Sequence, residues 1–82
     1  MKKVCTGNIL KNMRNINTKL SQKEIGEKLS TADTTISSYE RGKTQPDFET
    51  IVNYADICEF EIKIYNKKTK TEMTIEELSQ EL

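Results

Sequence analysis

The spacing of apolar residues changes from that of a helix to that of a strand partway along this chain of 82 residues, and that change most constrains how it can fold. Up to about residue 56 they recur at intervals of three and four, the period of an amphipathic helix. From Ile57 onward they alternate with polar residues, the period of a strand. The sequence therefore predicts a mainly α fold of four to five helices with a C-terminal β-hairpin and a short terminal helix. We place one unit at 1–56 and a tail at 57–82, both parts of one compact body.

The first two predicted helices are short. Apolar spacing predicts the first over about 7–15, and the Asn- and Thr-rich stretch 15–19 is predicted as a loop, because such side chains compete for backbone hydrogen bonds. Ser21 and Glu24 form an S-x-x-E capping box, which predicts the start of the second helix. Gly26 is a poor helix former, so we expect another helix to cross closely there.

A turn and a third helix follow. Residues 30–33 are predicted as a turn, and the third helix runs through Arg41 with Ile36 and Tyr39 on its buried side. Gly42 stands where a helix end adopts a left-handed conformation, which glycine does at least cost.

The last third carries two further capping signals. Asp47 is predicted to cap a fourth helix, whose apolar residues lie at i, i+3, i+4 and i+7: Phe48, Ile51, Val52 and Ala55. Residues 66–70 are predicted as a hairpin turn and 71–74 as its second strand. Thr74 and Glu77 form another capping box, and three apolar residues are spaced for a final short helix: Ile75, Leu78 and Leu82.

Composition excludes several kinds of catalytic and metal site. The chain has no histidine and two cysteines, Cys5 and Cys58, that form no CxxC pair. It therefore cannot build a Ser-His-Asp triad, a Cys-His dyad or a histidine-containing zinc motif, and its two thiols alone cannot complete a tetrahedral zinc site. We predict that it is not an enzyme and uses no metal or cofactor. With no apolar leader and no run of about 20 apolar residues, it is expected to be cytoplasmic and without a membrane partner.

The zero net charge conceals a division along the chain. Residues 1–46 contain nine basic and four acidic side chains, a net +5, whereas residues 47–82 contain four basic and nine acidic ones, a net −5. Such asymmetry indicates a basic half that faces nucleic acid, although charge also fluctuates along any short, highly charged chain.

A short helix, a four-residue turn and a second short helix form the helix-turn-helix unit, whose second helix fits the DNA major groove. Here the pattern is specific: L-S-Q-K-E-I-G-E-K-L over 20–29, then T-I-S-S-Y-E-R-G-K over 35–43, then Pro46. Over about 7–55 the chain resembles the phage repressor and Cro family of helix-turn-helix regulators, often called the Xre family. The resemblance implies a repressor-like domain that binds double-stranded DNA with the recognition helix 33–41 in the major groove.

The resemblance also implies a role for individual residues. The positions that match base-reading residues are Thr34, Thr35 and Ser38. The positions that match phosphate or backbone contacts are Ser21, Gln22, Arg41, Lys43 and Thr44. Gln22 also matches the glutamine that braces the recognition helix. Arg14 and Glu40 match an ion pair that holds the first helix to the recognition helix.

Three departures from the family pattern concern the start of the recognition helix and the turn before it. Ser30 stands where the family often has glycine. Ala32 replaces the usual Ser or Thr cap, so we expect Thr31 or Asp33 to supply the cap. Asp33 is favoured there by the helix dipole but repels phosphates, so we assign it no base-reading role.

Three functions remain open on the sequence alone. The first is a sequence-specific transcriptional repressor that reads a palindrome as a homodimer, with dimerisation through Phe60, Ile62 and Ile64 on the predicted strand. The second is an antitoxin, in which the acidic tail binds a toxin and the helix-turn-helix regulates its own operon. The third is a helix-turn-helix that has lost DNA binding and serves as an interaction scaffold.

Overall fold

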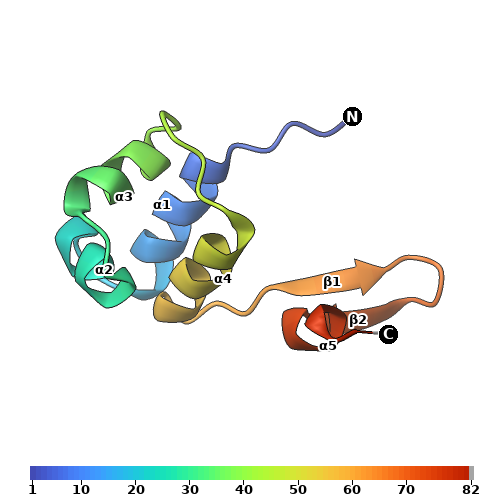
Figure 1. The fold of residues 1–82 in the computed structure, drawn as a ribbon. Helices are drawn as coiled ribbons and strands as arrows, with labels where there is room; N and C mark the ends of the chain where they lie inside the picture. The colour runs from blue at the N-terminus through green and yellow to red at the C-terminus, as the bar shows by residue number, and fades with distance from the viewer. Residues whose placement is uncertain (82) are drawn as a thin grey trace.

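The computed structural model describes residues 1–81, and its five helices and one hairpin follow the predicted order (Figure 1). The elements are α1 Thr6–Asn17, α2 Gln22–Leu29, α3 Asp33–Glu40, α4 Phe48–Ile57, β1 Lys63–Asn66, β2 Thr71–Thr74 and α5 Ile75–Ser79. Helices α1 to α4 form a rounded body, and the hairpin and α5 extend from one side of it. Leu82 of the predicted terminal helix lies outside the described residues.

The helical body closes around a small core. The fully buried apolar side chains that pack together are Leu10, Ile25, Ile36, Tyr54 and Cys58, contributed by α1, α2, α3 and the end of α4. Around them pack partly buried residues, among them Met13, Ile51 and Phe60. Phe48, assigned to the apolar face of α4 from its spacing, is exposed, since it lies in the first turn of the helix at the edge of this core.

The predicted helix signals are confirmed. Both capping boxes are formed: the Ser21 hydroxyl accepts from the Glu24 N–H, and the Thr74 hydroxyl accepts from the Glu77 N–H. The Asp47 carboxylate accepts from the Thr50 N–H at the start of α4. Each of these bonds satisfies an N–H that has no partner within its own helix, which fixes where α2, α4 and α5 begin.

The loop predicted over 15–19 is wrong in its first half, because α1 continues to Asn17. The Asn17 side-chain amide donates to the carbonyls of Cys58 and Glu59, at 3.2 and 3.3 Å. Its side chain is therefore engaged across the body and does not compete for the local backbone. Thr18, whose hydroxyl donates to the Arg14 carbonyl, follows the end of the helix.

The strand predicted from Ile57 begins six residues later, at Lys63, because α4 continues through Ile57 and is followed by a turn. The apolar alternation therefore divides between two environments. Phe60 packs against the helical core, Ile62 is half-buried between body and hairpin, and Ile64 on β1 is 45% exposed. Although these three residues are spaced two positions apart in the sequence, they do not lie together on one face of a strand.

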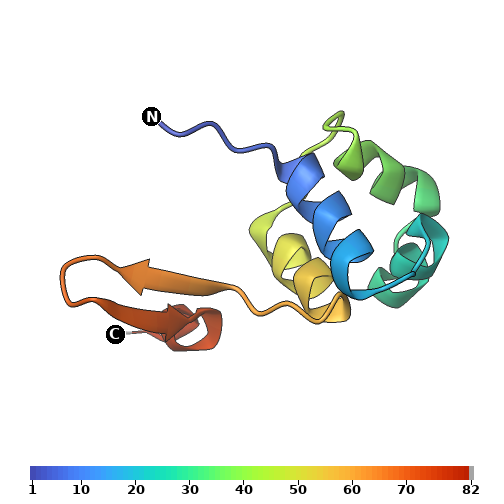
Figure 2. The same ribbon diagram turned by 180° about the vertical axis from the view of Figure 1, so that it is seen from behind.

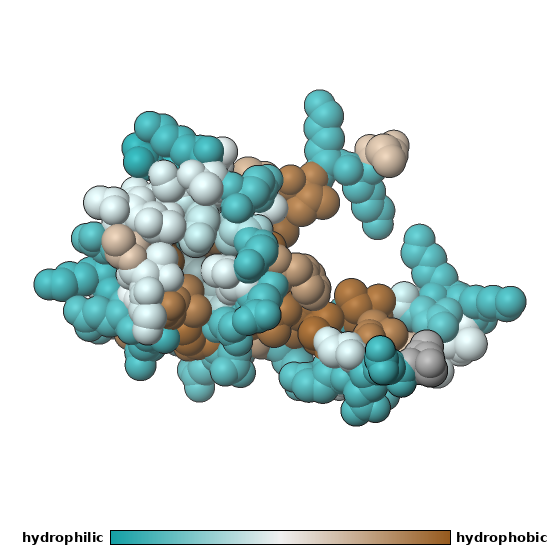
Figure 3. Space-filling view, in the orientation of Figure 1, coloured by the Kyte–Doolittle hydropathy of each residue, from teal (hydrophilic) through white to brown (hydrophobic). Residues whose placement is uncertain are grey.

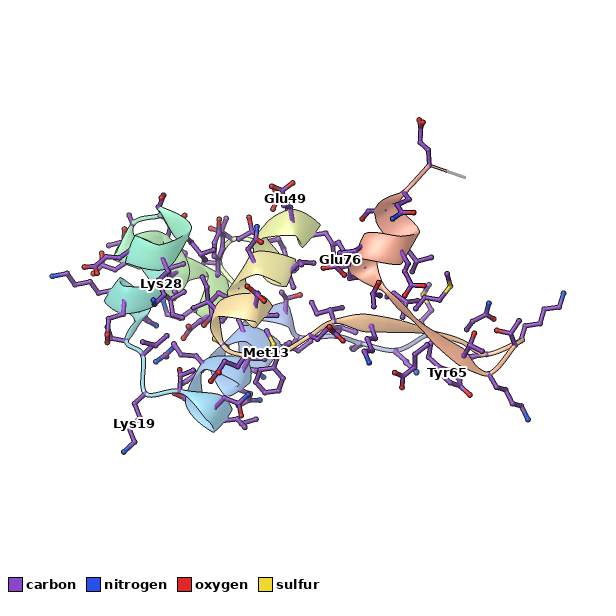
Figure 4. All side chains as sticks on the ribbon, turned by 90° about the horizontal axis from the view of Figure 1, so that it is seen from below. Met13, Lys19, Lys28, Glu49, Tyr65 and Glu76 are labelled. Atoms are coloured by element: carbon purple, nitrogen blue, oxygen red, sulfur yellow. The ribbon has the colours of Figure 1, made fainter. Side chains whose placement is uncertain are left out.

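The hairpin projects away from the helices, as both ribbon views show (Figure 2). Strands β1 and β2 pair antiparallel, with Ile64 opposite Met73 and Tyr65 opposite Glu72. In Figure 4 Tyr65 lies out along the hairpin, whereas Glu76 on α5 lies back near the helical body. The side chains of Val52, Ile62 and Ile75 line a small hollow where α4 meets the hairpin and α5.

Candidate nucleic-acid interface

The turn between α2 and α3 is built on two close backbone features. Ser30 follows α2 and adopts the left-handed backbone conformation, with φ of 54°. This conformation is unfavourable for a residue that has a Cβ. A Cβ on Gly26 would collide with the carbonyl oxygen of Thr31. The expected close approach at Gly26 is therefore real, but the neighbour is the backbone of the turn, not another helix. The absence of a side chain there lets α3 follow α2 directly.

The recognition helix α3 has a buried face and an outer face. Ile36 and Glu40 are buried, Thr34 is exposed, and Thr35 and Ser38 are half-buried at the surface. The three residues expected to read bases therefore all reach the surface of the same eight-residue helix. The space-filling view shows weakly polar surface over this part of the body, with the apolar surface gathered where the body meets the hairpin (Figure 3).

The start of α3 has no side-chain cap. Its N-cap is Ala32, and neither Thr31 nor Asp33 replaces the missing hydroxyl, contrary to expectation. The Thr31 hydroxyl instead donates to the Leu29 carbonyl at 3.1 Å, and Asp33 is the first residue of the helix itself. The exposed carboxylate of Asp33 lies in the first turn, where it interacts favourably with the helix dipole.

The start of α2 lies next to the end of α3. Ser21 is exposed, and its hydroxyl is used by the capping box. Gln22, the first residue of α2, is half-buried and donates from its amide to the Glu40 carboxylate at 3.2 Å. Gln22 thus joins the first turn of α2 to the last turn of α3, and the Ser21 backbone stays at the surface.

Glu40 is the centre of a buried polar network. Its carboxylate accepts two hydrogen bonds from the Arg14 guanidinium, at 2.8 and 2.9 Å, and one from the Tyr54 hydroxyl at 2.5 Å. Arg14 also donates to the Leu20 carbonyl at 3.1 Å. With Gln22, the network connects α1, the start of α2, the end of α3 and α4. Among residues 1–81 no buried side-chain nitrogen or oxygen lacks a hydrogen-bond partner.

The network determines the charge state of its members. Burial alone would raise the pKa of Glu40, but the hydrogen bonds from Arg14, Tyr54 and Gln22 outweigh it, so the pKa lies below its usual value. Burial, together with the hydrogen bond to Glu40, raises the pKa of Tyr54. Glu40 therefore stays an ionised acceptor and Tyr54 a neutral donor near neutral pH.

The segment after α3 presents two cations and a hydroxyl. Arg41, Lys43 and Thr44 are all exposed, and Gly42 between them has φ of 75°. The backbone N–H groups of Lys43 and Thr44 donate to the Ser38 carbonyl, at 2.9 and 3.4 Å. This loop is therefore folded back on the end of the recognition helix. The residues expected to contact the DNA backbone therefore lie near the end of α3, at the start of α2 and in this loop.

Two residues that support this arrangement were missed at the sequence level. Tyr54 is fully buried and donates to Glu40, yet it was not among the residues chosen for the core of α4, although it lies three positions after Ile51. Gly7 packs against the end of α3, where a Cβ would lie 2.5 Å from the Glu40 carbonyl oxygen. A glycine within an apolar-periodic helix was the available signal for this close contact.

Other kinds of site have less support in the described part of the chain. Within residues 1–81 no group of three or more acidic or cysteine side chains is placed to hold a metal ion. Over the same residues, no helix has both the length and the apolar character needed to cross a bilayer. Cys58 is buried, which raises the pKa of its thiol, and Cys5 is exposed at the start of α1.

Comparisons with known proteins agree with this geometry. Searches among curated proteins and among solved structures found no significant match. The sequence profile of the helix-turn-helix family matches residues 10–65, which is more than half of the chain and covers α2, α3 and the Glu40 network. The chain belongs to the helix-turn-helix family of the Cro and phage-repressor type, a family of Xre-like DNA-binding transcription regulators and not of catalytic domains.

Proposed function

We propose that this protein is a sequence-specific transcriptional repressor that binds a palindromic operator as a homodimer, with α3 in the major groove. The observation that carries the proposal is the Glu40 network, because it fixes the end of α3 against α1, α2 and α4. A recognition helix must be held rigidly, since a side chain reads a base edge only from a defined position.

The proposed contacts divide into two classes. Thr34, Thr35 and Ser38 face outward from α3 and read base edges or the adjacent sugar-phosphate. The residues that hold the DNA backbone lie near the end of α3, at the start of α2 and in the loop after α3: Ser21, Gln22, Arg41, Lys43 and Thr44. For Ser21 we propose the hydroxyl, which accepts from the Glu24 N–H and keeps its own hydrogen free to donate to a phosphate, because the Ser21 backbone N–H already donates to the Glu24 carboxylate.

The dimer is proposed to form through the hairpin. A two-stranded hairpin is marginally stable alone, and β1 presents Ile64 and Tyr65 largely to solvent. Ile64 and Tyr65 are successive residues of β1 and therefore point to opposite faces of the hairpin. Pairing of two copies across a twofold axis covers the face with Ile64 and sets the recognition helices about 34 Å apart, one turn of DNA. Phe60 acts indirectly in this proposal, because it packs on the helical core and anchors the start of the hairpin.

Footprinting on the DNA upstream of the gene tests the proposal. We expect a protected palindrome of two half-sites, with Thr34→Ala weakening binding to some operator variants and not to others. Lys43→Ala should weaken binding to all sequences alike and lower the dependence of log K on log salt by about 0.9. Failure of the wild-type protein to bind any DNA, even at low salt, would support the interaction-scaffold function instead.

A second candidate function is an antitoxin, favoured by the acidic and partly apolar tail. From residue 47 onward the chain has a net charge of −5, and Ile64, Tyr65 and Leu78 are exposed on the hairpin and α5. A small basic toxin encoded by a neighbouring gene would suit this surface. Co-expression followed by purification of a stable complex tests it, and absence of growth inhibition by the neighbouring gene product counts against it.

A further inference from the structure

The N-terminal arm, residues 1–5, leaves the start of α1 beside the loop that follows the recognition helix. The arm is not helical, and its side chains are exposed. Lys3, Val4 and Cys5 of the arm line a shallow surface hollow together with Gly42 and Gln45 of the loop. Figures 1 and 2 both show the arm extending from the body on the side of the connection between α3 and α4.

The arm extends the positive charge of that loop. It contributes Lys2 and Lys3, both exposed, next to the segment that carries Arg41 and Lys43. No acidic residue lies within residues 1–23. Of the acids on adjoining elements, the Glu40 carboxylate is turned inward to Arg14 and the Asp47 carboxylate caps α4, whereas Glu49 in the first turn of α4 is exposed. The four cations therefore lie on two adjoining segments, and within residues 1–81 none of them forms an ion pair.

From these observations we infer that Lys2 and Lys3 bind DNA phosphates beyond those held by Arg41 and Lys43, so that the arm lengthens the contact with the DNA backbone. This inference rests on the proposed function. Five extended residues span roughly 17 Å, and successive phosphates of one strand are spaced about 3.4 Å along the helix axis. The arm is thus long enough to reach several phosphates beside those contacted by the loop. Lysine is suited to this task because its ammonium is a mobile point charge that needs no fixed geometry.

The test compares two double variants of the full chain with equal loss of charge. Lys2→Ala with Lys3→Ala removes the cations of the arm. Lys67→Ala with Lys68→Ala removes two exposed cations from the tip of the hairpin, far from α3 in Figure 1. Affinity for a DNA fragment containing the operator, and for one lacking it, is measured from about 50 to 300 mM salt. Any purification tag is placed at the C-terminus.

For the arm variant we expect the slope of log K against log salt to fall by about 1.8, two contacts of about 0.9 each. At 0.1 M salt this corresponds to a loss of up to about 60-fold in affinity, equal on both DNA fragments because phosphates carry no sequence. Lys2→Arg with Lys3→Arg should restore the slope. The hairpin variant should change it by much less, and both variants should keep the wild-type melting temperature because all four side chains are exposed.

Three results would overturn the inference in distinguishable ways. Equal slopes for the arm variant and the wild type would show that the arm does not bind phosphate. A loss confined to the operator fragment would show base reading by the arm. If the wild-type protein binds neither fragment, the proposed function itself fails and the inference falls with it.

Discussion

Arg14 and Glu40 lie 26 positions apart in the sequence and form a bidentate ion pair, with Nε–Oε2 and Nη2–Oε1 distances of 2.9 and 2.8 Å. The Glu40 side chain is 2% exposed and the Arg14 side chain 14%. The pair joins α1 to the last turn of α3, and this turn leads into the loop that carries Arg41 and Lys43. The stability of the fold and the orientation of the recognition helix therefore depend on the same contact.

Breaking this pair from one side should be costly. Arg14→Ala or Glu40→Ala leaves an uncompensated, largely buried charge, and each should reduce the free energy of unfolding by about 3 kcal/mol. The double variant should lose clearly less than the sum of the two, which chemical denaturation can measure as a double-mutant cycle. Lys63→Ala is the matched control, since it removes an exposed ion pair with Glu72 and should leave the denaturation midpoint unchanged. Additive losses would contradict direct coupling.

The stability should depend on pH through Glu40. Its pKa in the folded protein lies below the unperturbed 4.5, so its contribution is present above about pH 4.5 and is lost as the pH falls through the folded-state value. Other carboxylates titrate in the same range, so the quantity to follow is the difference in stability between the wild type and Glu40→Gln. That difference should be largest above pH 5 and shrink on acidification. A constant difference from pH 7 to pH 2 would contradict the assignment.

Ser30 should be improved by glycine. It holds φ of 54° at the end of α2, which disfavours any side chain, and Ser30→Gly should raise the free energy of unfolding by about 0.5 to 1 kcal/mol. Gly42→Ala is the converse control: nothing lies within 4 Å of the added Cβ, so its expected loss of about 1 kcal/mol reports the backbone conformation alone. Thermal or urea unfolding of both variants checks the opposite signs.

The uncapped start of α3 offers a second stabilising change. Ala32→Ser places a hydroxyl at the N-cap, where it can accept from the N–H groups of the first turn, and should add about 1 kcal/mol. Ser21→Ala should remove a similar amount at the start of α2, where the bond is already made. Equilibrium unfolding measures both. If Ala32→Ser lowers stability, the turn cannot accommodate the additional atom.

The proposed dimer predicts an effect of Ile64→Lys. The side chain is 45% exposed on β1, so the change should scarcely affect the fold of one chain but should weaken association at least tenfold. Sedimentation at micromolar concentration measures this. Ile16→Lys is the matched control. Ile16 is 69% exposed on α1, outside the hairpin, so this substitution should leave association unchanged. A monomeric wild-type protein with and without operator DNA would contradict the dimer.

The sequence by itself determined the start points of α2, α4 and α5, the left-handed Gly42 and the helix-turn-helix motif. Each of these depends on residues within four positions of one another: a capping hydroxyl or carboxylate, a turn, an apolar period. It also indicated the exposed residues of α3, because Ile36 and Tyr39 marked the opposite face.

Only the tertiary structure decided the extension of α1 to Asn17, the late start of β1 and the hydrogen bond of Tyr54 to Glu40. Asn17 became helical because its amide found carbonyl partners 41 and 42 residues away, and Tyr54 was buried because it could donate to Glu40. Phe60 left the strand pattern because the helical core offered it a larger apolar contact than a two-stranded hairpin could. These outcomes depend on contacts between distant segments, whose energies are not encoded in any local pattern.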